Sequence, residues 1–202
     1  MSVEPTSTYT NLIVAIGGSA GGNQEIVTII SKLPEDYQGC IVVATHRAPT
    51  HTNTLAKVLG FKAQVEISEP FDHECLECTT VFIGAPDQKV EVNYDQFDIE
   101  RDPTGKSKLK RIDDLFSSVA KSAKHNAVGV ILSGAMSDGV QGLKDIHDAG
   151  GFCIVQDPKD AQFDSMPNNA LAEVDANFVG TAEEIADVLI EIASGRKCRP
   201  QD

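Results

Sequence analysis

Apolar and polar residues follow two different periods along the chain, and together these periods predict strands alternating with helices. Short apolar runs rich in β-branched residues indicate buried strands at 12–16, 40–45, 65–67, 80–84, 127–132, 152–155 and 177–179. Apolar residues spaced three or four apart indicate helices over 23–33, 54–59, 112–123, 140–149, 166–172 and the segment after 181. An alternating pattern over 89–101 predicts a hairpin that turns near Asp95-Gln96.

This order of elements predicts the α/β class. We expect a doubly wound, mainly parallel sheet with helices on both faces and an antiparallel hairpin at the edge. Gly60 and Gly195 are expected to end helices, and Thr181-x-x-Glu184 reads as a capping box that opens the last one. We expect one domain over residues 11–195, with an extension at 1–10 and a tail at 196–202.

Composition and charge narrow the classes of partner. No apolar run approaches the 18 or more residues of a membrane span, so membrane insertion is not expected. Residues 1–10 lack the basic and apolar regions of a signal peptide, and the expected compartment is therefore the cytoplasm. The net charge of −13 argues against nucleic acid or an anionic membrane surface as a partner.

A glycine-rich turn follows the first predicted strand and carries Ser19 at its apex. Gly17, Ser19 and Gly21 fit the G-x-S-x-G spacing of a nucleophile elbow, in which a sharp turn projects the serine hydroxyl above the sheet. A phosphate-binding turn is the alternative. The dinucleotide fingerprint needs glycine where Ser19 stands, and the Walker loop needs Lys-Ser/Thr where Asn23-Gln24 follows, so both common forms fail.

Three polar residues are predicted at the carboxyl ends of parallel strands, where ligands bind in such sheets. Ser19 follows the first strand, His46 ends the second, and Asp138 lies past the strand at 127–132. If they meet, Ser19 is a nucleophile, His46 its base and Asp138 the group that orients the histidine. Two simpler roles stay open: Asp138 could cap the helix that follows it, and His46 could bond only to backbone.

The chain has five cysteines at scattered positions, an odd number. Of the five, Cys40 and Cys153 lie in strand-like runs, where a buried reduced thiol is ordinary. His73, Cys75 and Cys78 form a C-x-x-C loop with one nearby histidine, but a second ligand pair at zinc-finger spacing is missing. A zinc site in this loop is therefore a weaker hypothesis than a loop without a metal.

The chain carries, in order, Ile16-Gly17-Gly18-Ser19-Ala20-Gly21-Gly22, Leu33-Pro34, Thr45-His46-Arg47-Ala48-Pro49, Ile83-Gly84-Ala85-Pro86, Arg111-Ile112-Asp113-Asp114-Leu115-Phe116, Gly129-Val130-Ile131-Leu132-Ser133-Gly134 with Asp138-Gly139, and Gln156-Asp157-Pro158 with Met166-Pro167. This series resembles the catalytic domain of the chemotaxis protein-glutamate methylesterases (CheB-type). The resemblance covers about residues 10–195 and so nearly the whole chain.

The resemblance implies a function. In that family the residues that match Ser19, His46 and Asp138 form a catalytic triad, with no metal and no organic cofactor. The reaction removes methanol from γ-methyl glutamate esters on cytoplasmic helices of chemoreceptors, and some members deamidate receptor glutamines. The implied partners are therefore a methylated protein substrate, such as a chemoreceptor helix, and a separate regulatory protein.

The sequence departs from the family pattern in three places. The usual Gly-Met-Gly is replaced by Gly134-Ala135-Met136, and the histidine usual after the Ala-Pro block is absent from the stretch that starts at Asp87. Only ten residues precede the predicted domain, which is expected to be a stand-alone form without a receiver domain.

The alternative function is a catalytically silent binding or signalling module of the same fold. Nucleotide binding at the glycine turn is a weaker hypothesis, because His46 replaces the acidic residue expected after the second strand.

Overall fold

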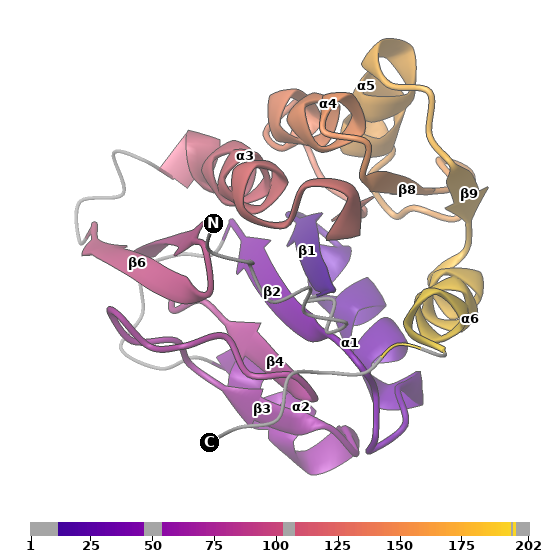
Figure 1. The fold of residues 1–202 in the computed structure, drawn as a ribbon. Helices are drawn as coiled ribbons and strands as arrows, with labels where there is room; N and C mark the ends of the chain where they lie inside the picture. Colours follow the sequence, from indigo (N-terminus) through magenta and orange to yellow (C-terminus); the bar gives the residue numbers. More distant parts are fainter. Residues whose placement is uncertain (1–11, 47–53, 103–107, 195, 197–202) are drawn as a thin grey trace.

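The computed structural model describes residues 12–46, 54–102, 108–194 and 196. In this part of the chain the main sheet has the order β3-β4-β2-β1-β7-β8-β9, and every pairing within it is parallel. Its strands are β1 (Ile13–Gly18), β2 (Cys40–Thr45), β3 (Glu66–Ser68), β4 (Thr80–Ile83), β7 (Ala127–Ile131), β8 (Phe152–Gln156) and β9 (Phe178–Gly180). The predicted parallel sheet is confirmed, with β1 in the middle (Figure 1).

Helices cover both faces of this sheet, as predicted (Figure 1). One face packs against α1 (Gly22–Lys32), α2 (Thr54–Lys62) and α6 (Ala182–Ala193). The other packs against α3 (Arg111–Ala123), α4 (Val140–Asp148) and α5 (Ser165–Glu173). Successive side chains of a strand point to opposite faces, so Val14 and Ile16 join the first core while Ile13 and Ala15 join the second. Burial on both faces explains the unbroken apolar runs.

Single-turn 3₁₀ helices, η1 (Lys108–Lys110) and η2 (Lys124–Asn126), flank α3. Two predicted helix ends can be compared with the structure. Helix α2 continues through Gly60 to Lys62, so the expected stop at Gly60 is wrong. The predicted capping box is present: the Glu184 N–H donates to the Thr181 hydroxyl at 3.3 Å, and the Thr181 N–H donates to the Glu184 carboxylate at 2.8 Å. Gly195 lies outside the described residues. Every helix in the described segments is too short or too polar to pass through a bilayer.

The antiparallel hairpin is a two-stranded sheet of its own, made of β5 (Gln88–Asn93) and β6 (Gln96–Arg101). It packs over α3 and does not extend the main sheet, because Val90, Val92 and Phe97 share a core with the apolar side of that helix. Its turn is Tyr94-Asp95, one residue earlier than expected, and Tyr94 adopts a positive φ of 58° there.

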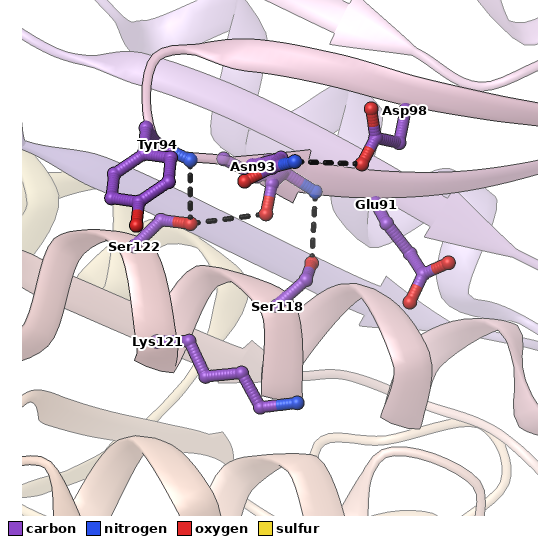
Figure 2. Close-up of a pocket in the computed structure, with 8 residues that line it drawn as sticks. Glu91, Asn93, Tyr94, Asp98, Ser118, Lys121 and Ser122 are labelled. Carbon is purple, nitrogen blue, oxygen red and sulfur yellow. Dashed lines mark hydrogen bonds between the residues drawn. The ribbon is translucent and has the colours of Figure 1, made fainter.

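Two serines of α3 attach the hairpin, and Figure 2 shows both beside a pocket of about 320 Å³. The Ser118 hydroxyl accepts the Val92 N–H at 2.9 Å, and the Ser122 hydroxyl accepts the Tyr94 N–H at 3.1 Å. Ser122 also donates to the Val92 carbonyl at 3.0 Å. Val92 and Ser118 are buried, whereas Tyr94 is exposed, so the two bonds differ in their access to water.

Ser118→Ala should lower the free energy of unfolding by about 1–3 kcal/mol, because it leaves the buried N–H of Val92 without an acceptor. Ser122→Ala is the matched control on the same helix. Ser122→Ala should lower the free energy of unfolding by less than about 1 kcal/mol, because water can reach the exposed Tyr94 N–H. Urea unfolding of the three proteins measures both values. Equal losses would show that burial of the Val92 N–H does not govern the attachment.

Candidate active site

Ser19 lies in the turn between β1 and α1, as the glycine pattern predicts. Its N–H donates to the Ser133 carbonyl at 3.0 Å, and its own carbonyl accepts the Gly22 N–H at 3.1 Å. The turn needs glycine at Gly21, where φ is +79° and a Cβ would lie 2.6 Å from the Ser133 hydroxyl oxygen. The first turn of α1 is therefore held against the loop that follows β7, with Ser19 half-buried at the junction.

His46 directly follows β2, which pairs with β1 so that Gly18 lies opposite Thr45. Ser19 and His46 are the next residues along these two strands and so leave the sheet side by side. The His46 N–H also donates to the Gly18 carbonyl at 3.3 Å. The parallel register therefore brings the predicted nucleophile and base to the same end of neighbouring central strands.

The His46 side chain meets Asp138, with 2.6 Å between Nε2 and Oδ2. Only 7% of the histidine side chain and 2% of the aspartate side chain are exposed to solvent. Because an ionised carboxylate only accepts hydrogen bonds, Nε2 must carry the proton, which leaves the Nδ1 lone pair for another donor. The suggestion that His46 bonds only to backbone is therefore wrong.

Asp138 also binds the start of α3. Its Oδ2 accepts the Ile112 N–H at 3.1 Å, and its Oδ1 accepts the Asp113 N–H at 3.0 Å. The free N–H groups and dipole of a helix N-terminus stabilise a carboxylate. The idea that Asp138 caps the helix after it is wrong, because the N-cap of α4 is Gly139 and the side chain turns to α3.

The described residues include no hydrogen bond between the Ser19 hydroxyl and His46. The structure thus joins two of the three predicted site residues directly and places the third on the adjacent strand end. Bonds of this kind often tighten only when substrate is bound.

The loop that carries Asp138 is held by buried polar groups that the sequence pattern did not single out. The Ser133 hydroxyl donates to the Ala20 carbonyl at 2.8 Å and accepts the Phe163 N–H at 2.9 Å. Gln156 Oε1 accepts the Ser133 N–H at 2.8 Å. Ser133 and Gln156 are both fully buried. The only sequence signals for this buried network are the positions of the two residues: Ser133 directly follows one apolar strand, and Gln156 ends another.

The departure at Gly134-Ala135-Met136 leaves the loop in a conformation suited to glycine. Met136 has a φ of +77°, a region that glycine adopts freely and that side chains rarely occupy. The Met136 carbonyl accepts a hydrogen bond from the Asn169 side chain at 2.7 Å. Gly134 packs so close to the turn that a Cβ there would lie 2.9 Å from the Ser19 Cβ and would overlap the sulfur of Met166.

Within the described hydrogen bonds, the N–H groups of Ala20 and Ala135 have no acceptor. Ala20 follows Ser19 in the chain, and Ala135 follows Gly134, where an added Cβ would lie 2.9 Å from the Ser19 Cβ. The N–H after a nucleophile is a common oxyanion donor. Two unpaired donors therefore lie on the two segments that meet at the serine.

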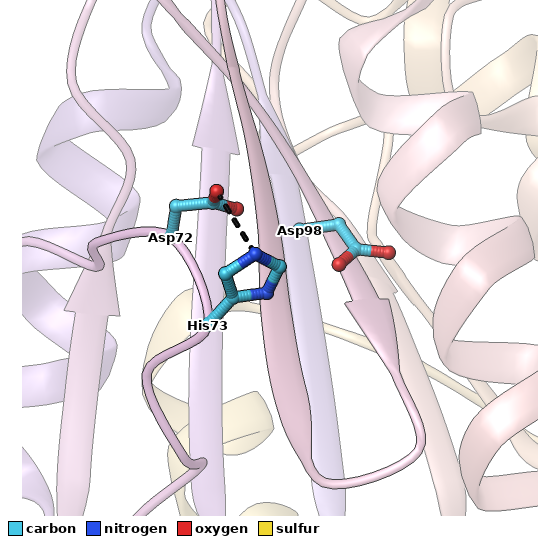
Figure 3. Close-up of side chains that lie close together, drawn as sticks. All are labelled: Asp72, His73 and Asp98. Atoms are coloured by element: carbon cyan, nitrogen blue, oxygen red, sulfur yellow. Dashed lines mark ion pairs between the residues drawn. The ribbon is translucent and has the colours of Figure 1, made fainter.

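The zinc hypothesis gains no support from the described residues. His73 lies near Asp72 and Asp98, with ligand atoms within 4.8 Å of one another, but neither Cys75 nor Cys78 joins this group (Figure 3). All three side chains are exposed, and both carboxylates already accept hydrogen bonds, from the Ile99 N–H and the Asn93 side chain. Exposed acidic groups of this kind are common on protein surfaces without a metal ion.

Two buried cysteines are unsuited to nucleophilic chemistry. Cys40 and Cys153 are free and buried, as predicted from their strands. Burial raises the pKa of the Cys153 thiol to about 12 and that of Cys40 further still. Both thiols are therefore protonated at neutral pH. A protonated thiol is a poor nucleophile, because only the thiolate attacks efficiently.

Comparisons with known proteins agree with one another. A family model described as CheB methylesterase matches residues 14–189. A protein-glutamate methylesterase/protein-glutamine glutaminase of Yersinia pestis is 32% identical over 193 residues, which cover 93% of this chain and 55% of that protein. One of the proteins of that name in Chromobacterium violaceum is 33% identical over 188 residues, which cover 91% of this chain and 52% of that protein.

A relative from Leptospira interrogans that carries a provisional form of the same name is 30% identical over 180 residues, which cover 89% of this chain and 93% of that protein. The chain thus spans nearly all of one relative and about half the length of the other two. Among solved structures, the crystal structure of the Thermotoga maritima CheB methylesterase catalytic domain superposes with a TM-score of 0.82 at 27% identity. That match covers 91% of this chain and 99% of the other.

Proposed function

Because this chain belongs to the CheB methylesterase family, we propose that it hydrolyses γ-methyl esters of glutamate residues in a protein and releases methanol. The names of the relatives add deamidation of protein glutamine as a second reaction of the same site. Both reactions attack a side-chain acyl group and differ only in the leaving group, methanol or ammonia. The proposed substrate is a methylated cytoplasmic helix of a chemoreceptor-like protein.

The proposed mechanism uses Ser19, His46 and Asp138. The Ser19 hydroxyl attacks the ester carbonyl carbon while His46 Nδ1 takes its proton, and Asp138 stabilises the imidazolium through Nε2–H. The tetrahedral oxyanion is received by the free N–H groups of Ala20 and Ala135. Collapse breaks the bond to the methoxy oxygen, which leaves as methanol with the proton from His46. Water then hydrolyses the acyl-serine by the same steps and restores Ser19.

The observation that carries this proposal is the buried 2.6 Å contact between His46 and Asp138 at the strand end beside Ser19. Holding a histidine and a carboxylate out of water is costly, and the pair orients Nδ1 as the free base nitrogen. A silent binding module would not need that arrangement. Its main support, the Gly134-Ala135-Met136 variant, is weakened because Met136 keeps a glycine-like backbone.

The direct test is methanol release. The protein is incubated with methyl-labelled chemoreceptor membranes and, separately, with lysate proteins methylated by the matching methyltransferase, and volatile label is measured. A second assay follows covalent labelling of Ser19 by a fluorophosphonate, which needs no protein substrate. Release of labelled methanol supports the proposal. A folded protein that neither releases methanol nor reacts with the fluorophosphonate would overturn it.

We expect the rate of Ser19 labelling to fall as the medium becomes acidic. The base must be a neutral imidazole, because an imidazolium has no lone pair that could take the Ser19 proton. Fluorophosphonate labelling from pH 5 to 8 measures this without interference from a titrating protein substrate. A flat profile over that range would exclude His46 as the base.

A further inference from the structure

Asp113 and Asp138 each bind the N-terminus of a helix that belongs to the other's segment. Asp138 precedes α4 but accepts the N–H groups of Ile112 and Asp113 at the start of α3. Asp113 lies in the first turn of α3, and its Oδ1 accepts the N–H groups of Gly139 and Gly142, both at 2.9 Å, at the start of α4. The two carboxylates therefore cap each other's helices.

These bonds close a ring around the main chain of Asp138. The Asp113 N–H donates to Asp138 Oδ1 at 3.0 Å, and the N–H of Gly139, the next residue, donates back to Asp113 Oδ1. The other oxygen of Asp138 is the one that meets His46. Asp113 thus fixes the peptide that positions this carboxylate, although within the described part of the chain it makes no hydrogen bond to His46.

The helix starts that form this ring approach too closely for ordinary side chains. A Cβ on Gly142 would lie 2.5 Å from Phe116 and 2.7 Å from the Asp113 carbonyl oxygen. Gly139 has a φ of +95°, and a Cβ there would lie 2.6 Å from both Ile112 and Ile131. The close approach places the backbone N–H groups of α4 within reach of a short aspartate side chain.

The ring also brings two acidic groups together. Burial, followed by the charge of Asp138, raises the pKa of the Asp113 carboxyl, although the backbone bonds from α4 oppose this. A raised pKa in an acid means that the ionised form destabilises the folded state above that pKa. An amide at position 113 keeps one acceptor oxygen without the charge, so stability at neutral pH does not require the carboxylate.

From this geometry we propose that Asp113 is a positioning residue for the reaction, because its oxygen holds the Gly139 peptide and so keeps Asp138 against His46. The inference rests on the proposed function. Losing the acceptor should let Asp138 shift, and a misplacement of about 1 Å can cost about 10²-fold in rate. The effect should appear in kcat and in the labelling of Ser19, because Asp113 acts on the base and not on substrate binding.

The test compares Asp113→Ala with Asp113→Asn. Asp113→Ala should lower kcat for methanol release and the fluorophosphonate labelling rate by about 10- to 100-fold, with KM within about threefold. Asp113→Asn should recover both rates to within about tenfold of wild type. Asp114→Ala is the matched control in the same turn of α3. It removes the same charge, but the Asp114 carboxylate pairs with Lys89 of the hairpin, at 3.3 Å. It should be close to wild type.

A third readout does not depend on activity. The His46 Nε2 proton shared with Asp138 should give a downfield proton NMR resonance in wild type and in Asp113→Asn, and it should broaden or vanish in Asp113→Ala. A folded Asp113→Ala that keeps the resonance and reacts like Asp114→Ala would overturn the inference. So would a folded Asp113→Asn as slow as the alanine variant. If wild type itself is inactive, the proposed function fails, and the resonance alone decides the role of Asp113.

Discussion

Ser19→Ala should reduce methanol release by about 10⁴-fold or more and abolish fluorophosphonate labelling, because the substitution removes the proposed nucleophile. The fold should survive. The described hydrogen bonds of Ser19 are made by its backbone, and alanine keeps both the N–H bond to Ser133 and the carbonyl bond from Gly22. Single-turnover assays with methyl-labelled substrate, alongside thermal unfolding, measure the two outcomes.

Ser137→Ala is the control for this substitution, since it removes a hydroxyl from an exposed serine in the neighbouring loop. Its turnover should match wild type. If Ser19→Ala remained folded with turnover near that of Ser137→Ala, another group would have to be the nucleophile and the serine-esterase proposal would be wrong.

Asp138→Asn should also cost about 10⁴ in turnover, the effect that the same change has on the triad of a serine protease. The structure explains why. An amide that turns its NH₂ toward His46 Nε2 favours the tautomer with the proton on Nδ1, which removes the base nitrogen of the proposed mechanism. If the amide instead turns its oxygen toward His46, its NH₂ opposes the Asp113 N–H and weakens the start of α3.

This dual contact changes the stability expected of the variant. Both oxygens of Asp138 accept backbone N–H groups, and asparagine can satisfy only one of them, so Asp138→Asn should lose about 1–3 kcal/mol. In a chain of this size each kcal/mol lowers the melting temperature by about 2–4 °C. Asp114→Asn, which has no contact with His46, serves as the control in calorimetry and in the esterase assay. If Asp138→Asn were active, the Asp138 carboxylate would not be required to orient His46, and its place in the proposed triad would be wrong.

Most of the fold could be predicted because its strands are buried on both faces. The apolar run of β2 predicts the bounds of the strand, Cys40–Thr45, to the residue. The hairpin shows the limit of this reasoning. The alternation of Val90, Val92 and Phe97 shows that one side is buried, but it does not say whether a sheet edge or a helix covers that side. The predicted helix end at Gly60 is wrong, because the sequence pattern of a glycine beyond the last apolar position is the same whether the helix ends or continues.

The site could be predicted only as far as strand order allows. The carboxyl ends of β1, β2 and β7 must lie together, which places Ser19, His46 and the Asp138 loop at one edge. The contact between His46 and Asp138 spans 92 residues of sequence, and no spacing rule gives it. The mutual capping of α3 and α4 was also invisible, since it depends on how closely two helix starts approach in space.

The outer strands of the main sheet have a consequence for the behaviour of the chain in concentrated solution. Strands β3 and β9 form its two edges and have three residues each, whereas β1 and β2 have six. A long edge exposes a row of unpaired backbone groups onto which another copy can add a strand, the first step toward aggregation. Edges this short offer little template for such growth, and the long, strongly apolar strands are enclosed between them.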